Sequence, residues 1–168
     1  MVGPSPLVPA ATAVGISLDQ QLCLALYTAS RAMTARYRVA LNQVGLTYPQ
    51  YLVMLLLWED GPTSVGGIGS RLSLDSSTLS PLLKRLQAMG LVTRTRAATD
   101  ERLMIIGLSE RGAALEAETA QVAAEMGEAT GQTPEEYREL TGQLRELAAR
   151  LEASTAQAVT TAAGLPAS

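Results

Sequence analysis

The stretch LDSSTLSPLLKRLQAMGLVTRTRAATDERLMIIGLSERG, residues 74–112, is divided by its turn signals into a helix, a ribbon and the start of a second helix. Asp75 is a favourable helix N-cap and Gly90 is a favourable stop, so we predict a helix between them. Pro81 falls inside this pattern. Either the helix bends there, or it begins late with Ser80 as its cap.

Beyond Gly90 the chain has the composition of a β-hairpin. The segments LVTRTR (91–96) and RLMIIGL (102–108) are short and rich in β-branched residues, and the polar AATDE connects them. Ser109 is the expected cap of the next long helix, with Glu110 in its first turn.

Three helices are predicted before the quoted stretch. Apolar residues recur at helical spacing from Leu18 as far as Gly45. A second helix is expected to begin at Pro49 and to stop at Gly61. A short helix, weakened by its glycines, is expected within residues 63–74.

The last helix opens with Thr133 as its cap, Pro134 as its first residue and Glu136 completing a capping box. Its apolar residues then follow one another at steps of three and four, which is the spacing of a heptad seam that faces another helix. The seam comprises Tyr137, Leu140, Leu144, Leu147 and Leu151.

This order of elements predicts a winged helix-turn-helix: a mainly α fold with a small β-hairpin wing, whose N- and C-terminal helices form a dimerisation region. The expected boundaries are one domain over residues 18–153, with dimerisation helices at about 18–44 and 109–153 and a DNA-binding part at about 49–108. Residues 1–17 and 154–168 are expected to be a disordered N-terminal tail and a frayed C-terminal tail.

Composition argues against most enzymes. The 168 residues include no histidine and one cysteine, Cys23, so the chain lacks an imidazole base, a Ser-His-Asp triad and a zinc site. We expect neither a cofactor nor a metal. A lone cysteine forms no internal disulfide, which fits a reducing cytoplasm, and no run of about 18 apolar residues is present to span a membrane.

Charge is distributed unevenly along the chain. Between Ser64 and Arg111 there are seven basic and four acidic residues, a net charge of +3, whereas the remainder carries −6 and the whole chain −3. A basic stripe is often only a solvated helix face. Here an acidic protein concentrates positive charge on the segment whose predicted shape enters DNA, which favours DNA binding.

The candidate DNA-binding residues fall into three groups. Short hydroxyls at the helix start suit base edges and phosphates, two basic residues further along suit phosphate, and arginines beside the hairpin tip suit a minor groove. They are Ser76, Ser77, Thr78 and Ser80, then Lys84 and Arg85, then Arg94, Arg96 and Arg102. Because the Asp100 carboxylate repels phosphate, we expect it to orient Arg102 through a salt bridge.

Residues 74–112, including the D-x-R pattern at Asp100 and Arg102, resemble the recognition helix and wing of the MarR family of bacterial regulators. The segments LDQQLCLALYTASRAMTARYRVAL (18–41) and LTYPQYLVMLLLWE (46–59) resemble its organic hydroperoxide sensor branch, called OhrR. The resemblance covers about residues 18–153. It implies a homodimer that binds a pseudo-palindromic DNA operator.

The resemblance also implies that the first-helix cysteine reacts with an organic hydroperoxide. In that branch tyrosines hold the thiol, and the matching positions are Tyr37 and Tyr48, with Tyr27 as a further candidate. Many members carry a second, resolving cysteine toward the C-terminus. This chain has none.

Two interpretations of Cys23 follow from the residues. A lone cysteine in a Leu/Ala helix is usually a small buried apolar side chain. Cys23 lies off the Leu22/Leu26 stripe, however, and hydroxyl-bearing residues follow near its face, where they would stabilise a thiolate. Fourteen helical residues place Tyr37 about 21 Å from Cys23 in the same chain. A contact between them therefore requires a second subunit whose first helix runs antiparallel.

Together these observations predict a repressor that releases its operator when an organic hydroperoxide oxidises Cys23. Without a resolving cysteine, the sulfenic acid is expected to form a mixed disulfide with a small thiol. Two alternatives remain open. One is a MarR-type repressor released by a phenolic ligand, with Cys23 structural, and the other is a one-cysteine thiol peroxidase.

Overall fold

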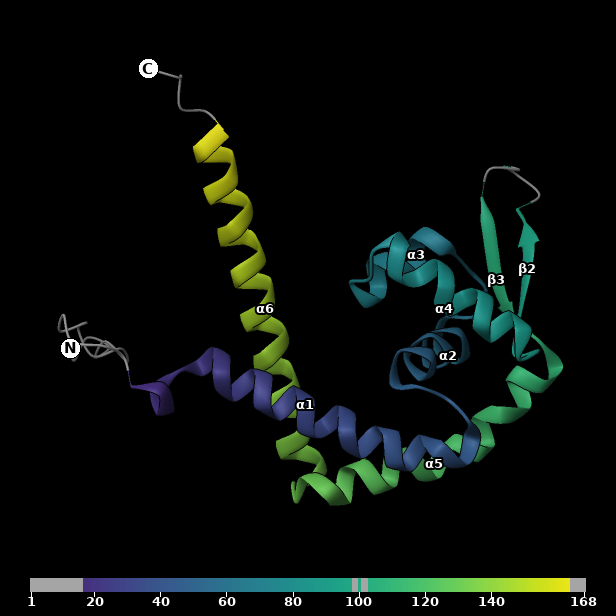
Figure 1. Ribbon diagram of the computed structural model, residues 1–168, viewed down its shortest axis with the longest axis horizontal. Coiled ribbons are helices and arrows are strands. Elements are labelled where there is room, and N and C mark those ends of the chain that lie inside the picture. The colour runs from purple at the N-terminus through teal and green to yellow at the C-terminus, as the bar shows by residue number, and fades with distance from the viewer. Residues whose placement is uncertain (1–16, 98–99, 101–102, 164–168) are drawn as a thin grey trace. The chain divides into compact units, whose positions relative to one another are not determined.

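The computed structural model describes residues 17–97, 100 and 103–163 (Figure 1). Its helices are α1 Leu22–Leu41, α2 Tyr48–Asp60, α3 Val65–Leu72, α4 Ser76–Ala88, α5 Glu110–Thr130 and α6 Pro134–Ala163. Its strands are β1 Thr63–Ser64, β2 Val92–Arg96 and β3 Met104–Leu108. This is a winged helix-turn-helix with long terminal helices, so the predicted fold class is confirmed. The chain forms two compact units, which divide after Glu116.

The central helix of the first unit is α2. Six of its thirteen residues are buried and they face several directions, as expected for a helix surrounded by other elements. Helices α1, α3 and α4 and strand β3 all contact it (Figure 1). The most completely buried side chains of this core are Leu41, Val53, Met54, Leu57, Ile68, Leu79, Leu83, Leu86, Leu91 and Ile106.

The wing is an antiparallel sheet with the strand order β1-β3-β2. Strands β2 and β3 pair along their full length, which confirms the predicted hairpin. Thr63 and Ser64 of β1 pair with the other edge of β3, although the sequence assigned them to the following helix. A two-residue strand shows no alternation of apolar and polar residues that a pattern could detect.

Helix α4 begins at Ser76, with Asp75 as its cap, and Pro81 lies inside it. The alternative start with Ser80 as cap is therefore wrong. Helix α2 begins one residue before Pro49.

The first helix is shorter than predicted. Leu18–Gln20 and Asn42–Val44 are 3-10 turns on either side of α1, and Gly45 ends the segment in the left-handed conformation, at φ 68°. In the part of the chain that the structure describes, no helix has the length and apolarity needed to cross a membrane.

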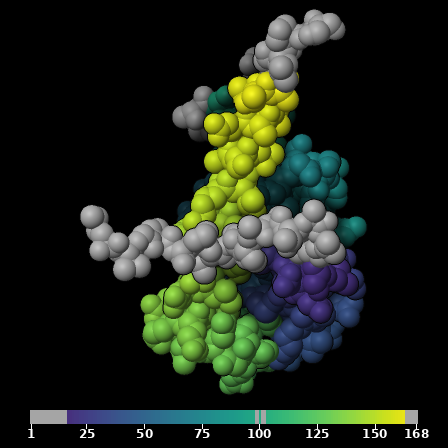
Figure 2. Space-filling model, turned by 90° about the vertical axis from the view of Figure 1, so that its left-hand side faces the viewer, coloured from purple at the N-terminus to yellow at the C-terminus, as the bar shows by residue number. Residues whose placement is uncertain are grey.

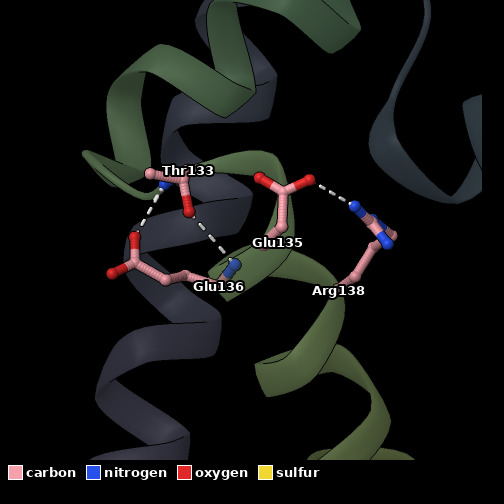
Figure 3. A network of polar contacts seen from close by, with 4 residues as sticks. All are labelled: Thr133, Glu135, Glu136 and Arg138. Carbon is pink, nitrogen blue, oxygen red and sulfur yellow. Dashed lines mark hydrogen bonds and ion pairs between the residues drawn. The ribbon is translucent and has the colours of Figure 1, made fainter.

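The predicted capping box at the start of α6 is present (Figure 3). The Thr133 N–H donates to Glu136 Oε2 at 2.8 Å, and the Glu136 N–H donates to Thr133 Oγ1 at 3.2 Å. Helix α6 continues to Ala163, so residues 154–163, predicted to be frayed, are helical. The reason is compositional: ASTAQAVTTAA (153–163) is rich in alanine and contains no glycine or proline.

A close approach of two backbones joins the start of α5 to the segment after α4. A Cβ atom added at Gly112 would lie 1.9 Å from the Leu91 carbonyl oxygen. Ser109 caps α5 by accepting the Gly112 N–H at 2.9 Å, and its own hydroxyl donates to the Gly90 carbonyl at 2.6 Å. We call this region, residues 89–91 and 109–112, the α4–α5 junction.

Two longer side chains complete the α4–α5 junction. Arg111 Nη1 donates to the Met89 carbonyl oxygen at 2.9 Å, which satisfies an acceptor at the end of α4. Trp58 Nε1, from α2, donates to the Gly112 carbonyl oxygen at 2.9 Å. Helices α2, α4 and α5 are thus tied together at one place.

Gly112→Ala should destabilise the protein, because the new methyl group would overlap the Leu91 carbonyl and force the α4–α5 junction apart. We expect a loss of about 1–3 kcal/mol or more in the free energy of unfolding, measured by urea denaturation at fixed protein concentration. Gly127→Ala is the matched control in α5: its added Cβ would meet nothing within 4 Å, so stability should rise by up to about 1 kcal/mol. Equal effects of the two variants would contradict the close approach.

The start of α6 should weaken in acid. The backbone N–H of Thr133, and then its hydroxyl, hold the pKa of the Glu136 carboxyl below its usual range. A lowered pKa in the folded state stabilises above the ordinary carboxyl pKa, and this stabilisation is lost as the pH falls through the folded-state value. Far-ultraviolet circular dichroism should show a smaller acid-induced loss of helix in Glu136→Gln than in wild type. Glu146→Gln, in the middle of α6, should lose helix in acid as wild type does. If the acid titration of Glu136→Gln overlaid that of wild type, the proposed pH dependence would be wrong.

Candidate nucleic-acid interface and cysteine environment

Helix α4 has one apolar and one polar face. Its leucines at 79, 82, 83 and 86 are buried, and the six predicted DNA-binding residues are all exposed. Those six are Ser76, Ser77, Thr78, Ser80, Lys84 and Arg85. Ser77 lies seven residues before Lys84, and Thr78 lies seven before Arg85, so each hydroxyl shares a helix face with a cation two turns later. We call this exposed strip the α4 polar face.

The Asp75 carboxylate organises the start of the α4 polar face. Its Oδ1 accepts the Ser77 hydroxyl at 2.5 Å and the Thr78 N–H at 2.8 Å, and its Oδ2 accepts the Thr78 hydroxyl at 3.2 Å. The Ser77 hydroxyl, followed by the Thr78 N–H, holds the pKa of Asp75 below its usual range. The cap was predicted, but the two hydroxyl contacts were not, because cap preference alone does not specify them.

The wing presents its arginines from β2. Arg94 and Arg96 are two residues apart and share one face of the strand, where they pair with Ile106 and Met104 of β3. Arg94 is half-buried and Arg96 is exposed. Asp100 is exposed as well, whereas Arg102, its predicted salt-bridge partner, lies outside the described residues.

Cys23 is the second residue of α1 and is exposed in the single chain. The interpretation of a buried apolar cysteine therefore does not describe this chain by itself. Tyr27, one turn later, is 58% exposed. Its hydroxyl accepts from Arg31 Nη1 at 3.3 Å, and the guanidinium lies 5.6 Å from the ring centroid.

Tyr37 and Tyr48 lie together, as neighbours on α1 and α2, with ring centroids 4.5 Å apart. Tyr51 extends this cluster at 6.0 Å from Tyr37, and Trp58 follows at 6.4 Å from Tyr51 in a T-shaped contact. The sequence did not single out Tyr51 and Trp58, although their spacing from Tyr48 by three and ten residues on one helix was a usable signal. We call these four residues the aromatic cluster.

The structure does not bring Cys23 of the same chain to the aromatic cluster. Cys23 and Tyr37 belong to the same straight run of α1, which separates them by about 21 Å of helix rise. Among the described residues, no group of three histidine, cysteine, aspartate or glutamate side chains is placed to hold a metal.

A groove of about 720 Å³ runs along α1 to the start of α2. Two arginines, several hydroxyl and amide side chains and Tyr48 line it. The lining residues are Ser30, Arg31, Thr34, Ala35, Arg38, Asn42, Gly45, Leu46, Thr47, Tyr48 and Pro49. We call it the α1–α2 groove.

Comparison with known proteins gives concordant matches. The model of the transcriptional regulators SarA/Rot matches residues 36–118. The HTH-type transcriptional regulator TtmR of Methylorubrum extorquens is 47% identical over 137 residues, 82% of this chain and 70% of TtmR. The organic hydroperoxide resistance transcriptional regulator of Bacillus subtilis is 41% identical over 132 residues, 79% of this chain and 90% of that protein. Among solved structures, that of reduced AbfR bound to DNA is similar, with a TM-score of 0.67 and 37% sequence identity. The match covers 82% of this chain and 96% of the AbfR chain. AbfR is a Staphylococcus epidermidis protein.

Proposed function

This chain belongs to the MarR/SarA-type family of DNA-binding transcriptional regulators, and from that premise we propose that it is a cytoplasmic repressor switched by oxidation of Cys23. The observation that carries the proposal is the placement of the chain's one cysteine, exposed at the start of the helix that also bears Tyr37. A relative named for organic hydroperoxide resistance, and structures of reduced and overoxidized AbfR bound to DNA, support the choice of signal.

In the proposed DNA complex, α4 enters the major groove of an operator and the wing reaches the neighbouring minor groove. The α4 polar face supplies hydroxyls to the base edges and cations to the phosphates. Arg94 and Arg96 extend the positive charge along β2. A pseudo-palindromic operator would match two such heads in a dimer.

A homodimer is the assembly that the exposed apolar residues support. In the 3-10 turn before α1, Leu18 is 70% exposed, and Leu22, the first residue of α1, is 59% exposed. On α6, Leu140, Leu144 and Leu151 of the predicted heptad seam are 40–57% exposed. Figure 2 shows the C-terminal half of this helix, in yellow, at the surface. A second chain is the occupant we propose, because such a seam usually faces another helix.

The dimer would also complete the sensor. If the two α1 helices run antiparallel, Tyr37 and Tyr48 of one protomer approach Cys23 of the other, which a single chain does not allow. Their hydroxyls would stabilise the thiolate. The thiolate sulfur attacks the hydroperoxide O–O bond and takes one oxygen, so that the cysteine is oxidised by two electrons to a sulfenic acid and the peroxide is reduced to an alcohol.

The sulfenic acid would then condense with a small thiol, which forms a mixed disulfide and releases water. The added group would occupy a packed interface and displace the helices there. Because each Cys23 lies displaced along an antiparallel pair of helices, the two sulfurs would be too far apart for a disulfide between protomers, which needs Cα atoms within about 7 Å.

The α1–α2 groove favours a second candidate function, release by a phenolic or other anionic ligand. Arg31 and Arg38 would attract the negative charge, and the hydroxyls would orient the ligand. A third candidate, a one-cysteine thiol peroxidase, would repeat the oxidation with turnover.

Cumene hydroperoxide should release wild-type protein from the DNA upstream of its gene but leave Cys23→Ser bound, as measured by gel shift.

In the double variant Tyr37→Phe with Tyr48→Phe, Cys23 should be oxidised more slowly while DNA binding stays normal, because the variant loses hydrogen bonds to the thiolate. Intact mass after oxidation with a small thiol should show one adduct per chain. Release of Cys23→Ser by a phenolic ligand would favour the second candidate, and repeated peroxide consumption without DNA the third.

Arg96→Ala should weaken binding to all DNA sequences and lower the salt slope of the binding constant by about one. The reason is the loss of one phosphate contact, which releases one fewer counterion. Fluorescence anisotropy at several salt concentrations measures the slope. Arg145→Ala on α6, outside the DNA-binding part, should keep both affinity and slope; an unchanged slope in Arg96→Ala would contradict the proposed docking of the wing.

Leu144→Asp combined with Leu147→Asp should abolish dimerisation, operator binding and cooperative unfolding, because charges would be buried in the proposed seam. Size-exclusion chromatography with light scattering reads the mass. Gln143→Asp, beside the seam, should remain a dimer. A folded monomer of the double variant that still binds the operator tightly would exclude the dimer proposal.

A further inference from the structure

The start of the recognition helix α4 carries a fixed set of hydrogen-bond protons. The carboxylate of Asp75 has no proton of its own when ionised, so it only accepts hydrogen bonds. The Ser77 and Thr78 hydroxyls lie 2.5 and 3.2 Å from its two oxygens. Both hydroxyls must therefore donate to Asp75, and each has one proton to give.

Asp75 is ionised at neutral pH. The bonds from Ser77 and Thr78 hold its pKa below the usual carboxyl range, and its position at the helix N-terminus favours negative charge as well. The arrangement is therefore present under the conditions in which a regulator binds DNA.

With their protons committed, Ser77 and Thr78 present only lone pairs to the outside. Both residues are exposed at the N-terminal end of α4, whereas Lys84 and Arg85 lie toward its C-terminal end. In the major groove the hydrogen-bond donors are the N6 amino group of adenine and the N4 amino group of cytosine. Guanine O6 and N7, thymine O4 and phosphate oxygens are all acceptors, and they would face lone pairs without a proton between them.

We infer that Asp75 is a positioning residue that sets the base preference of α4. By accepting hydrogen bonds from the Ser77 and Thr78 hydroxyls, it leaves both hydroxyls able only to accept from DNA. The DNA strand that each hydroxyl faces must therefore carry adenine or cytosine at that position, because these bases hold the amino donors of the major groove. The inference rests on the proposed entry of α4 into the major groove. The Asp75 charge supports the same placement, because it would repel a phosphate but not a base amino group.

Asp75→Asn tests the inference with little change of shape. The amide oxygen can still cap the helix by accepting the Thr78 N–H and the Ser77 hydroxyl, as Oδ1 does now. The amide nitrogen then replaces Oδ2 and donates to the Thr78 hydroxyl. That hydroxyl must turn its proton outward, whereas the Ser77 hydroxyl keeps its present direction.

The experiment is selection of binding sites from a randomised duplex pool by wild type and by Asp75→Asn. Ser77→Ala and Thr78→Ala should each lose base preference at one position of the selected DNA site. That position identifies the base pair that the missing hydroxyl contacts. Wild type should select adenine or cytosine at both. Asp75→Asn should keep this choice at the Ser77 position and shift to guanine or thymine at the Thr78 position, by about five- to tenfold.

Two controls separate base choice from charge and folding. Asp60→Asn removes an exposed carboxylate from α2 and should raise affinity for all sequences without changing the selected bases. Thermal unfolding should show Asp75→Asn to be folded. A third comparison replaces the selected adenine by purine, which lacks the amino group. This replacement should weaken binding by wild type, but it should not weaken binding by the Ser77→Ala or Thr78→Ala variant that lacks the hydroxyl contacting that base.

Asp75→Asn that selects the same bases as wild type would overturn the inference while leaving DNA binding intact. A folded Asp75→Asn that binds no sequence would also overturn it, because Asp75 would then act on affinity rather than on base choice. A wild type that selects no sequence at all would overturn the proposed docking of α4, and the inference with it.

Discussion

The contact of Gly112 with the Leu91 carbonyl is the constraint on which the DNA-binding part depends. Only a residue without a Cβ atom allows α5 to start so close to the segment that ends α4 and begins β2. The hydrogen bonds of Ser109, Arg111 and Trp58 then join the same segments. Helix α4, the wing and the start of α5 are therefore joined at one place, and a displacement of the start of α5 would carry the proposed DNA-reading surfaces with it.

Most of the fold was predictable because helix ends have local chemical signals. Asp75, Ser109 and Thr133 cap their helices as expected, and the hairpin follows from its β-branched segments. Strand β1 and the full length of α6 were not predicted. Strand β1 exists only because β3 offers an unpaired edge, which is a tertiary effect. Helix α6 extends to Ala163, beyond the predicted start of the frayed tail, because its alanine-rich end favours helix.

The sequence predicts part of the candidate site as a set of residues, but it does not predict their arrangement. Sequence indicated Cys23, Tyr37 and Tyr48, and the helix rise alone separated the first two. The 4.5 Å contact between the tyrosines depends on how α1 packs on α2, which no spacing encodes. The same limit applies to α4: cap preference identified Asp75, but the directions of the hydroxyl protons required side-chain geometry.

The aromatic cluster has an optical consequence. Trp58 is the one tryptophan of the chain, and its indole N–H is bonded at the α4–α5 junction while its ring meets Tyr51 at 6.4 Å. Tyrosines this close transfer excitation to the indole, and the emission colour of an indole follows the polarity around it. Light absorbed by these tyrosines should therefore be emitted by Trp58, whose emission reports the polarity at the α4–α5 junction.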